Sequence, residues 1–431
     1  MTIIYWFRRD RRLSDNPALS LAIAKARDID TTLLPVALRE DNPEVQWGFK
    51  RLGSHRLAFE DQSLDGLARD LRSLGSDLYQ PQAPGMAGLI KLAKEVRASC
   101  IICEAIEAPQ ELDEIDALRT SSIEVHCIEQ SALLPDESLP FHISNTPTVF
   151  SEFRRQVEAG KSLPREPLPC PKSLPPLPEN IPVATPHRVS ATLPALDRRS
   201  AFAYQSTGWH GHATDGFSHL QRYFAGALPR RYKESRNGLI GSDYSTKFSP
   251  WLSVGAISAA QIWQTLKTHE DRHGANDSTY WIWFELLWRD HFRLMMRRFG
   301  RQLFLRKGLS KQPSAQPAHH PAKFDRWRTG NTGHDFIDAA MRELSATGYL
   351  SNRMRQVAAS YLIHDLDGDW RAGAAWFEHC LIDFDVHSNQ GNWAYIAGVG
   401  TDPRGGRRFN PDKQARDYDS DGSYRKLWSV T

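Results

Sequence analysis

Polar side chains of three kinds gather in an otherwise apolar stretch between residues 348 and 400. Asn352 and Arg355 are three residues apart, so a helix would place their amide and guanidinium on one face. Asp383 and Asp385 follow a second amphipathic segment, at a point where the chain must change direction. Carboxylates in such places are usually helix caps or solvated turns. With Arg355 as a partner, they could instead form a buried charge-assisted pair beside a ligand.

The segment 281–299 (WIWFELLWRDHFRLMMRRF) combines large apolar residues with a row of arginines. Arg289, Arg293 and Arg297 recur every four residues, which places them on one face of a helix. Such a row is usually a solvated face, and the alternative is a surface that contacts phosphate groups. Another face has the spacing of a core stripe and comprises Trp281, Phe284, Trp288, Phe292, Met295 and Phe299.

Tryptophan is distributed unevenly along the chain. Of the 13 tryptophans only Trp6 and Trp47 precede residue 200. A helical core that uses large side chains as fillers would explain this asymmetry. A stacked aromatic cofactor or an electron path in the second half would explain it too. Composition alone favours core packing.

Length and composition are those of a cytoplasmic globular protein with two domains. The 431 residues exceed one ordinary core, and 40% hydrophobic and 24% charged residues are ordinary globular values. The mean hydropathy is −0.51, and the sequence contains neither a long apolar run nor a signal peptide, so we expect neither a membrane span nor secretion. The net charge of +3 means that nucleic-acid binding would need a local basic patch. Five cysteines argue against a disulfide framework, and Cys100 and Cys103 are expected in a buried strand.

Strands and helices alternate over residues 1–130, which predicts an α/β domain with a doubly wound, Rossmann-like parallel sheet. Asn16 and Pro17 mark the start of its first helix. No G-x-G-x-x-G follows the first strand, which argues against an NAD-type site. A helix at 51–73 is expected to bury the face formed by Leu57, Leu64, Leu67 and Leu71. The strands are expected at 3–7 and 31–38, and near 77–80, 100–104 and 123–127.

The regular pattern ends near residue 130. Proline is dense at 164–182, so this stretch cannot form a helix. We therefore expect residues 131–205 to be a Pro-rich interdomain linker. Helical periodicity returns afterwards with few strand signals, which predicts an all-α domain over 206–431.

Long motifs resemble those of one family, densely after residue 230 and sparsely between 40 and 200. They are WFRRDRRLSDNPAL (6–19), YKESRNGLIGSDYSTKFSPWLS (232–253), WFELLWRDHFR (283–293), GNTGHDFIDAAMREL (330–344), TGYLSNRMRQVAASYLIHDL (347–366), DWRAGAAWFEHCLIDFDVHSNQGNWAYIAGVGTDPR (369–404) and FNPDKQARDYD (409–419). In these segments the chain resembles photolyases and cryptochromes, most closely the cryptochrome DASH branch. The resemblance implies FAD bound in a U shape within the helical domain.

The resemblance also assigns residues to the flavin. Arg355 and Asp383 would flank the isoalloxazine, Asp385 would lie near its polar edge and Asn389 would face N5. Asparagine at 389 is the residue type found in photolyases and in this branch. The remaining cofactor residues would be Arg289 and Asn352, with the pyrophosphate cradled by Tyr232, Ser245, Thr246, Lys247, Phe248 and Ser249.

The family reaction is light-driven: excited FADH⁻ gives an electron to a cyclobutane pyrimidine dimer, the ring splits and the electron returns. By resemblance, Glu285 would hydrogen-bond the dimer, Trp288 would stack on it and Asn352 would contact both flavin and substrate. Asn352 and Gln356 stand where (6-4) enzymes have two histidines, which argues against that repair. Tyr395 replaces a tryptophan of double-strand-specific enzymes, which implies a preference for single-stranded DNA.

The same resemblance extends to DNA, electron transfer and an antenna. Arg293, Arg297, Arg404, Arg407 and Arg408 would contact DNA phosphates. Trp393 and Trp370 match the inner two members of an electron-transfer series. The third position of the series falls at or near Pro317, where no tryptophan stands. The path would therefore end at Trp327 or Trp376, or photoreduction would be slow. Glu107 is the nearest match to an acidic residue that holds a folate (methenyltetrahydrofolate) antenna, and otherwise it is a surface carboxylate.

Three functions are compatible with these residues. The first is light-driven repair of pyrimidine dimers by a protein expected to be a monomer without membrane contact. The second is a cryptochrome-type blue-light photoreceptor with little repair activity. The end of the sequence at Thr431, directly after the last motif, favours repair, because a sensor would be expected to carry a long extension. A nucleic-acid-binding flavoprotein without photochemistry is the third.

Overall fold

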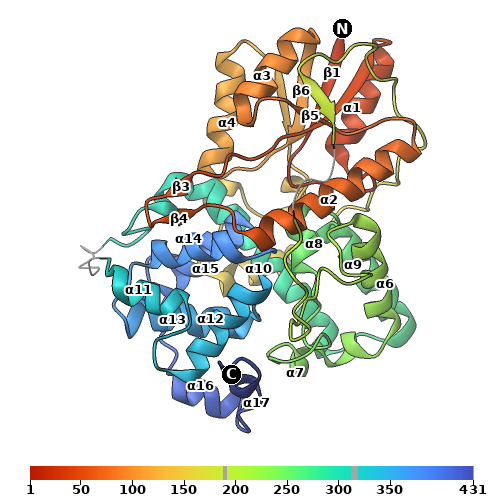
Figure 1. Ribbon diagram of the computed structural model, residues 1–431. Helices are drawn as coiled ribbons and strands as arrows, with labels where there is room; N and C mark the ends of the chain where they lie inside the picture. Colours follow the sequence, from red (N-terminus) through yellow and green to blue (C-terminus); the bar gives the residue numbers. More distant parts are fainter. Residues whose placement is uncertain (188–191, 312–318, 431) are drawn as a thin grey trace.

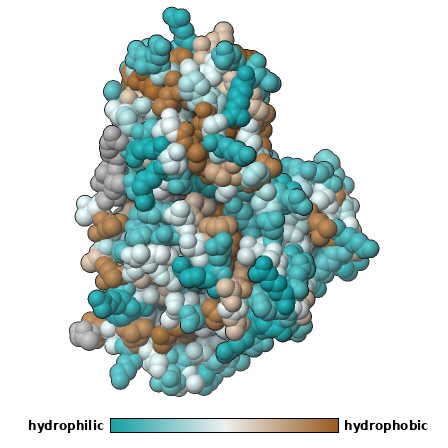
Figure 2. Space-filling model, turned by 90° about the vertical axis from the view of Figure 1, so that its right-hand side faces the viewer, coloured by the Kyte–Doolittle hydropathy of each residue, from teal (hydrophilic) through white to brown (hydrophobic). Residues whose placement is uncertain are grey.

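The computed structural model describes residues 1–187, 192–311 and 319–430, which form two lobes (Figure 1). The upper lobe holds the sheet and the lower lobe is helical. This confirms the expected α/β domain followed by an all-α domain. In the face shown in Figure 2, hydrophobic residues gather in the upper lobe and again along the lower edge of the molecule. No helix of the described residues is long and apolar enough to span a membrane.

The sheet has the strand order β7-β6-β1-β2-β5-β8, and its strands pair in parallel except β8, which is antiparallel to β5. Along β1, Ile3 and Tyr5 pack against α1 and α2, whereas Ile4 and Trp6 pack on the opposite face with α3 and α4. Strand side chains alternate between faces, so this pattern produces a sheet covered on both sides. The strands are β1 (Thr2–Phe7), β2 (Thr32–Ala37), β5 (Tyr79–Pro81), β6 (Ala98–Glu104), β7 (Val125–Ile128) and β8 (Ala184–Pro186).

The helices of this lobe are α1 (Pro17–Asp28), α2 (Ser54–Ser73), α3 (Gly85–Glu95) and α4 (Pro109–Thr120). Asn16 caps α1 by accepting from the Leu19 amide, with Pro17 as the first helical residue, as predicted. The expected face of α2 is correct for Leu64, Leu67 and Leu71 but wrong for Leu57, which is 37% exposed. Cys100 and Cys103 are buried on β6, and all five cysteines are free, as expected.

Residues 131–205 are more than a linker. They contain α5 (Phe150–Ala159) and strand β8, which extends the sheet beside β5. Residues 164–182 contain neither helix nor strand, as their proline content predicts. Phe150 and Phe153 of α5 are buried in the helical core. The sequence pattern missed α5 because one amphipathic helix between two proline-rich stretches gives little periodic signal.

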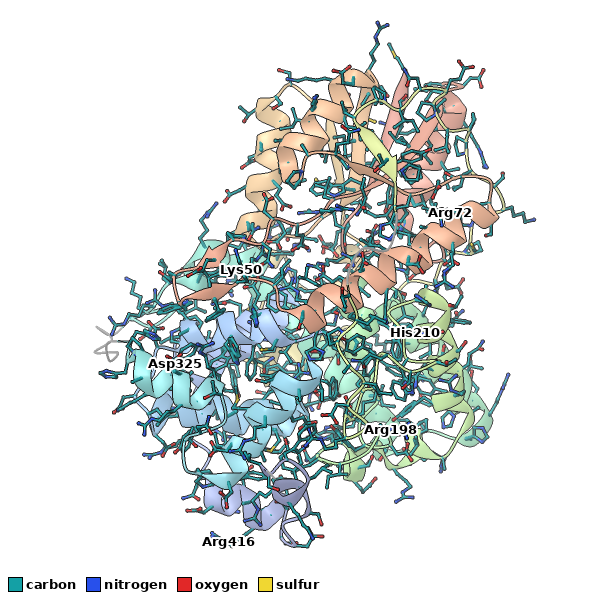
Figure 3. The ribbon with its side chains drawn as sticks, viewed as in Figure 1. Lys50, Arg72, Arg198, His210, Asp325 and Arg416 are labelled. Carbon is teal, nitrogen blue, oxygen red and sulfur yellow. The ribbon has the colours of Figure 1, made fainter. Side chains whose placement is uncertain are left out.

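The helix α2 connects the two lobes (Figure 1). Its later turns, with Leu64 and Leu67, belong to the core beneath the sheet, whereas Ala58 and Phe59 belong to the helical core. A short hairpin of β3 (Glu44–Val45) and β4 (Phe49–Lys50) also leaves the upper lobe, and Phe49 packs against Trp376 in the helical lobe. Figure 3 shows Lys50 of this hairpin at the seam between the lobes.

The long helix α10 (Asp277–Phe299) runs through the lower lobe. Asn276 and Thr279 form a capping box at its start. Gly391 of α15 lets this helix approach closely, because a Cβ there would lie 2.1 Å from Phe292 Cδ1. The other helices are α6 (Ala213–Ala225), α7 (Tyr232–Ser235), α8 (Ser249–Val254), α9 (Ala259–His273), α11 (Pro321–Arg328), α12 (Asp335–Thr347), α13 (Asn352–His364), α14 (Trp370–Cys380), α15 (Val386–Ile396), α16 (Pro411–Tyr418) and α17 (Ser423–Leu427).

Candidate functional site

A cavity of about 490 Å³ lies in the helical lobe, among α7, the loop before α8, α10, the start of α13 and one face of α15. This volume is typical of a small-molecule site. Its wall brings together most of the residues singled out from the sequence, although they are up to 163 positions apart, from Tyr232 to Tyr395. These residues are Tyr232, Ser245, Thr246, Lys247, Phe248, Ser249, Glu285, Trp288, Arg289, Asn352, Arg355, Asp383, Asp385 and Tyr395.

The loop before α8 has an unusual backbone and a buried cation. Ser245 and Lys247 both have left-handed backbones, with φ of 59° and 57°. Lys247 is 2% exposed, and its Nζ has no hydrogen-bond partner among the described residues. It lies 3.0 Å from the ring centre of Tyr244. Burial lowers the pKa of Lys247 well below its usual value. An anion at this position would restore the charge, so the loop fits the diphosphate of FAD.

Arg355 and Asp383 form the buried pair that the sequence suggested. Arg355 Nη2 donates to Asp383 Oδ2 at 2.8 Å, and the carboxylate side chain is 1% exposed. Ser249 Oγ donates to the same oxygen at 2.7 Å. Arg355 is held by a second hydrogen bond, from Nε to the Leu350 carbonyl at 2.8 Å. Burial disfavours the charge of Arg355, but Asp383 outweighs this and raises its pKa.

Asp385 has a different role from Asp383. Its Oδ1 accepts from the Ser388 amide at 2.8 Å and caps α15. Its Oδ2 accepts from Arg293 Nη2 at 3.1 Å. Burial opposes ionisation of Asp385, but Arg293 and His387 hold its pKa well below the usual value. The carboxylate is thus fixed at the cavity wall as an anion.

The row of arginines on α10 does not form one exposed surface. Arg293 is 8% exposed and pairs with Asp385, so the expectation that it contacts DNA is wrong. Arg289 lines the cavity and donates to the Ser131 carbonyl at 2.6 Å. Burial and the neighbouring Arg293 lower the pKa of Arg289 to about 10. Regular spacing in the sequence does not show which acidic residues of other elements lie beside each arginine. Here those acidic residues determine which arginines are free to contact a ligand.

Glu285 is oriented by a residue that the sequence analysis did not single out. Arg236 Nη1 donates to Glu285 Oε1 at 2.5 Å, and both side chains line the cavity. Burial raises the pKa of Glu285, although Arg236 opposes the shift. Arg236 lies in the motif YKESRNGLIG, so its place in that motif was the only signal that could have identified it.

Trp288 and Tyr395 meet at the cavity wall. The Trp288 ring stacks on Phe150 of α5 with centroids 3.7 Å apart and planes 9° apart. The Trp288 and Tyr395 rings are nearly perpendicular, with centroids 5.8 Å apart. Phe150 could not be identified from the sequence, because its helix was not recognised. Trp288 and Phe284 line the cavity and are only partly buried, so the expected core stripe on α10 is incomplete there.

Arg407 is directed at Tyr395. Its Nη2 donates to the Tyr395 hydroxyl at 2.5 Å, and its Nε lies 2.9 Å from Asp402 Oδ2. Arg404 is exposed, and Arg408 pairs at the surface with Asp365 at 3.1 Å. Of the five arginines expected to contact DNA, these three remain available at or near the surface.

Asn389 and Trp393 border a second, smaller cavity of about 70 Å³. Asn352, Arg355, Asp383 and Asp385 line both this cavity and the larger one. Asn389 Nδ2 donates to the Ala374 carbonyl at 3.1 Å, which fixes its amide. The two cavities therefore form adjoining parts of one site.

Trp393 and Trp370 are both buried, at 2% and 1% exposure. Gly373 makes room for Trp393, because a Cβ there would lie 2.2 Å from Cη2 of its ring. Trp393 meets the Trp327 edge at a centroid distance of 6.2 Å. Trp370 Nε1 donates to the Arg306 carbonyl at 3.1 Å. Pro317 lies outside the described residues.

Glu107 faces α10 and not a cavity of the upper lobe. Its carboxylate pairs with Arg297 Nε, and Arg297 also donates to Asp136 Oδ1 at 2.6 Å. Arg297 is thus engaged by two acids. A separate cavity of about 390 Å³ in the upper lobe is lined by Trp6, Arg8, Arg9 and Glu111, among others, without Glu107.

Comparison with known proteins agrees with this geometry. Residues 3–172 match the family model of DNA photolyase, and residues 281–430 match the FAD binding domain of DNA photolyase. The chain is 40% identical to cryptochrome DASH of Gloeobacter violaceus, over 99% of this chain and 85% of that protein. It is 39% identical to cryptochrome DASH of Synechocystis sp., over 99% of this chain and 87% of that protein.

Solved structures are similar over both lobes. The crystal structure of a Synechocystis cryptochrome superposes with a TM-score of 0.88 and 37% identity, covering 99% of this chain and 88% of that one. A bacterial class III photolyase from Agrobacterium tumefaciens superposes with a TM-score of 0.80 and 28% identity, covering 99% and 86%. The chain therefore belongs to the DNA photolyase and cryptochrome family, on its cryptochrome DASH branch, and its helical lobe is an FAD-binding domain.

Proposed function

We propose that this protein repairs cyclobutane pyrimidine dimers with blue light, using FAD as the cofactor and preferring single-stranded DNA. One observation supports the proposal most directly. The same cavity wall carries residues suited to a flavin, such as Lys247 and Arg355, and residues suited to two joined pyrimidine bases, such as Glu285 and Trp288. Reduced flavin bound there supplies an electron when it absorbs blue light.

The chain's own residues hold the flavin in this proposal. Lys247 and the hydroxyls of Ser245 and Thr246 bind the diphosphate, and Ser249 lies beside them with its hydroxyl donated to Asp383. Arg355 and Asp383 flank the ring system, and their mutual hydrogen bond fixes both side chains before the cofactor arrives. Asp385, Asn389 and Arg289 complete the flavin surroundings. Such preorganisation lowers the entropy lost on binding.

The damaged dinucleotide enters the same cavity after leaving the base stack. Lost pairing at a lesion makes that step cheaper, since flipping a base costs about a few kcal/mol. Glu285 hydrogen-bonds the pyrimidine edge and stabilises charge that develops there, with Arg236 setting its orientation. Trp288 provides the stacking surface, and Asn352 lies between substrate and flavin.

Tyr395 sets the preference for single strands. A tyrosine ring offers less stacking area than a tryptophan, and its hydroxyl is engaged by Arg407. Less stacking leaves less binding energy to extract a dimer from a duplex. Arg404, Arg407 and Arg408 contact DNA phosphates near the cavity mouth. Trp393 and Trp370 carry electrons to the flavin, and Trp327 offers a second route into Trp393, because their ring centres are 6.2 Å apart.

A folate antenna remains part of the proposal, but Glu107 is a weak candidate to hold it. Its carboxylate already pairs with Arg297, and a folate would have to replace this ion pair. A second function, blue-light reception with little repair, is favoured by the names of the curated relatives, which are called cryptochrome.

Repair and reception are separated by one experiment. Reduced protein is illuminated with oligonucleotides that carry one thymine dimer, in single- or double-stranded form, and loss of the lesion is followed. We expect faster loss in the single strand. Glu285→Ala should lower the yield with FAD retained, whereas Asp277→Ala, on the exposed start of the same helix, should not. Flavin that responds to light while no lesion is lost would favour the photoreceptor.

A further inference from the structure

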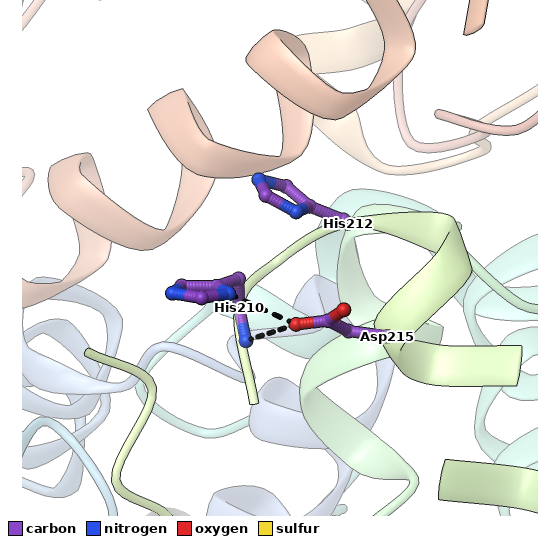
Figure 4. A group of neighbouring side chains, drawn as sticks. All are labelled: His210, His212 and Asp215. Atoms are coloured by element: carbon purple, nitrogen blue, oxygen red, sulfur yellow. Dashed lines mark hydrogen bonds and ion pairs between the residues drawn. The ribbon is translucent and has the colours of Figure 1, made fainter. Parts of the chain in front are cut away.

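Two histidines and an aspartate lie together at the start of α6, away from the flavin cavity. They occur in the sequence His210-Gly-His212-Ala-Thr-Asp215, and none of them lines that cavity. One ligand atom from each residue lies within 4.8 Å of the others. Figure 4 shows Asp215 beside His210, with the His212 ring above them on the side of α2. The family motifs quoted above do not include this segment.

The first turn of α6 fixes two of the three side chains. Asp215 Oδ2 accepts from the His210 amide and from its Nδ1, both at 3.0 Å. The His210 carbonyl accepts from Trp251 Nε1 at 2.8 Å. Gly211 packs directly on α2, where a Cβ would lie 2.6 Å from the Phe59 carbonyl oxygen. The backbone of this segment is therefore held in place without any ion.

His212 is positioned by α2 from the other side. A Cβ on Gly66 would lie 2.9 Å from His212 Cδ2, so only glycine at 66 leaves room for the ring. Arg69 Nη2 lies 2.8 Å from Nε2 and 3.0 Å from Nδ1 of His212. The His212 ring is thus held on the α2 side of the cluster by its fit against Gly66 and its contact with Arg69.

Two structural explanations account for part of this arrangement. The contact of His210 with Asp215 is a local cap, and Arg69 can serve as a cation that orients His212. Neither explains why a second imidazole stands 5.1 Å from the first between ring centres, with a nitrogen within 4.8 Å of the ligand atoms of His210 and Asp215. Two imidazole nitrogens and one carboxylate oxygen are a donor set that Zn²⁺ and similar divalent ions prefer.

We infer that His210, His212 and Asp215 bind one divalent transition-metal ion of the zinc class, with water in the remaining position. The side chains of His210 and Asp215 are 28% and 21% exposed, so an ion can reach them. Arg69 must move aside from His212, and its side chain is 54% exposed and forms its ion pair with Asp65, one turn earlier on α2. The bound ion would tie the segment packed on α2 to the first turn of α6, at the seam where Figure 3 shows His210.

The test uses full-length, tag-free, flavin-loaded protein stripped with a chelator and titrated with Zn²⁺ by calorimetry, with bound metal measured afterwards. We expect one ion per chain. His212→Ala and Asp215→Asn should each weaken binding by about tenfold or more. Arg69→Ala should tighten it severalfold, because a competing cation is removed. His334→Ala is the matched control, since His334 contacts Asp412 at 3.1 Å without a second histidine in the described groups.

Each outcome decides the inference. Loss of the ion in the two ligand variants, with flavin content unchanged, supports it, and tighter binding by Arg69→Ala supports it further. Equal Zn²⁺ binding in wild type, His212→Ala and Asp215→Asn overturns it. Weakening by His334→Ala as large as that by His212→Ala overturns it too, because binding would then be non-specific. Should the ligand variants lose flavin, Arg69→Ala decides alone, and unchanged affinity rejects the site.

Discussion

Replacing Asp383 with asparagine tests whether the pair with Arg355 holds the site together. The substitution keeps the size of the side chain and an oxygen that can accept from Ser249, but removes the charge. Arg355 then faces the cavity wall without a counter-charge. The Asp383 side chain is 1% exposed and that of Arg355 is 23% exposed, so water compensates the guanidinium only in part.

The expected loss of stability follows from these exposed fractions. A hydrogen bond to a charged group contributes about 1.5–3 kcal/mol. Breaking a fully buried pair costs about 3–5 kcal/mol, and partial solvation of Arg355 reduces this cost, so we expect the substitution to lower the free energy of unfolding by about 2–3 kcal/mol. Unfolding entropy is roughly 2.1 cal/mol/K per residue, so Tm should fall by about 3 °C if all 431 residues unfold together, and by about 5 °C if the helical lobe unfolds alone.

Thermal unfolding of the flavin-loaded protein measures the shift, and released FAD measures cofactor retention. Asp365→Asn is the matched control, because it makes the same chemical change in an exposed pair with Arg408. Exposed pairs contribute about 0–1 kcal/mol, which corresponds to roughly 1 °C or less for the whole chain and to roughly 2 °C or less for the helical lobe alone. If Asp383→Asn retains all its FAD and behaves like the control, the pair does not organise the site.

Three further predictions concern the cofactor, the electron path and pH. Lys247→Met should weaken FAD binding by about ten- to hundredfold, through loss of one charge-assisted hydrogen bond, as measured by flavin titration of apoprotein. Trp393→Phe should slow photoreduction far more than repair by pre-reduced protein, and equal losses in both assays would contradict an electron relay. Burial raises the pKa of Glu343 to about 8, so this carboxyl stays protonated in the folded state while it ionises in the unfolded state. Stability should therefore fall as pH rises from about 4.5 to about 8, and Glu343→Gln should flatten the dependence of Tm on pH over this range.

The sequence predicts most elements of the upper lobe because their signals are local. A continuous apolar run identifies β1, and the Asn16–Pro17 pair identifies the start of α1. The error at Leu57 has a simple physical reason. Helical spacing specifies a face but not where along the helix its partner ends. Leu57 lies in the first turns of α2, where Ala58 and Phe59 pack against the helical core in place of the leucine face.

The site is predictable only where a motif carries it. Arg355 and Asp383 were paired correctly, since both stand in recognisable segments with complementary charge. Phe150 supports Trp288 and comes from α5. Arg236 orients Glu285 and comes from the segment following α7. No periodicity within α10 indicates either partner. The failure at Arg293 has the same origin, because its acid comes from the start of α15.

The balance of charge in the cavity argues for an anionic occupant. Its three wall acids each have a cation: Glu285 pairs with Arg236, Asp383 with Arg355 and Asp385 with Arg293. Arg407 is paired with Asp402. Among the described residues that line the cavity, Lys247 and Arg289 are left without an acidic partner, and burial lowers the pKa of both. Two cations without an acidic partner of their own are stabilised by a ligand that brings negative charge, which the diphosphate of FAD does.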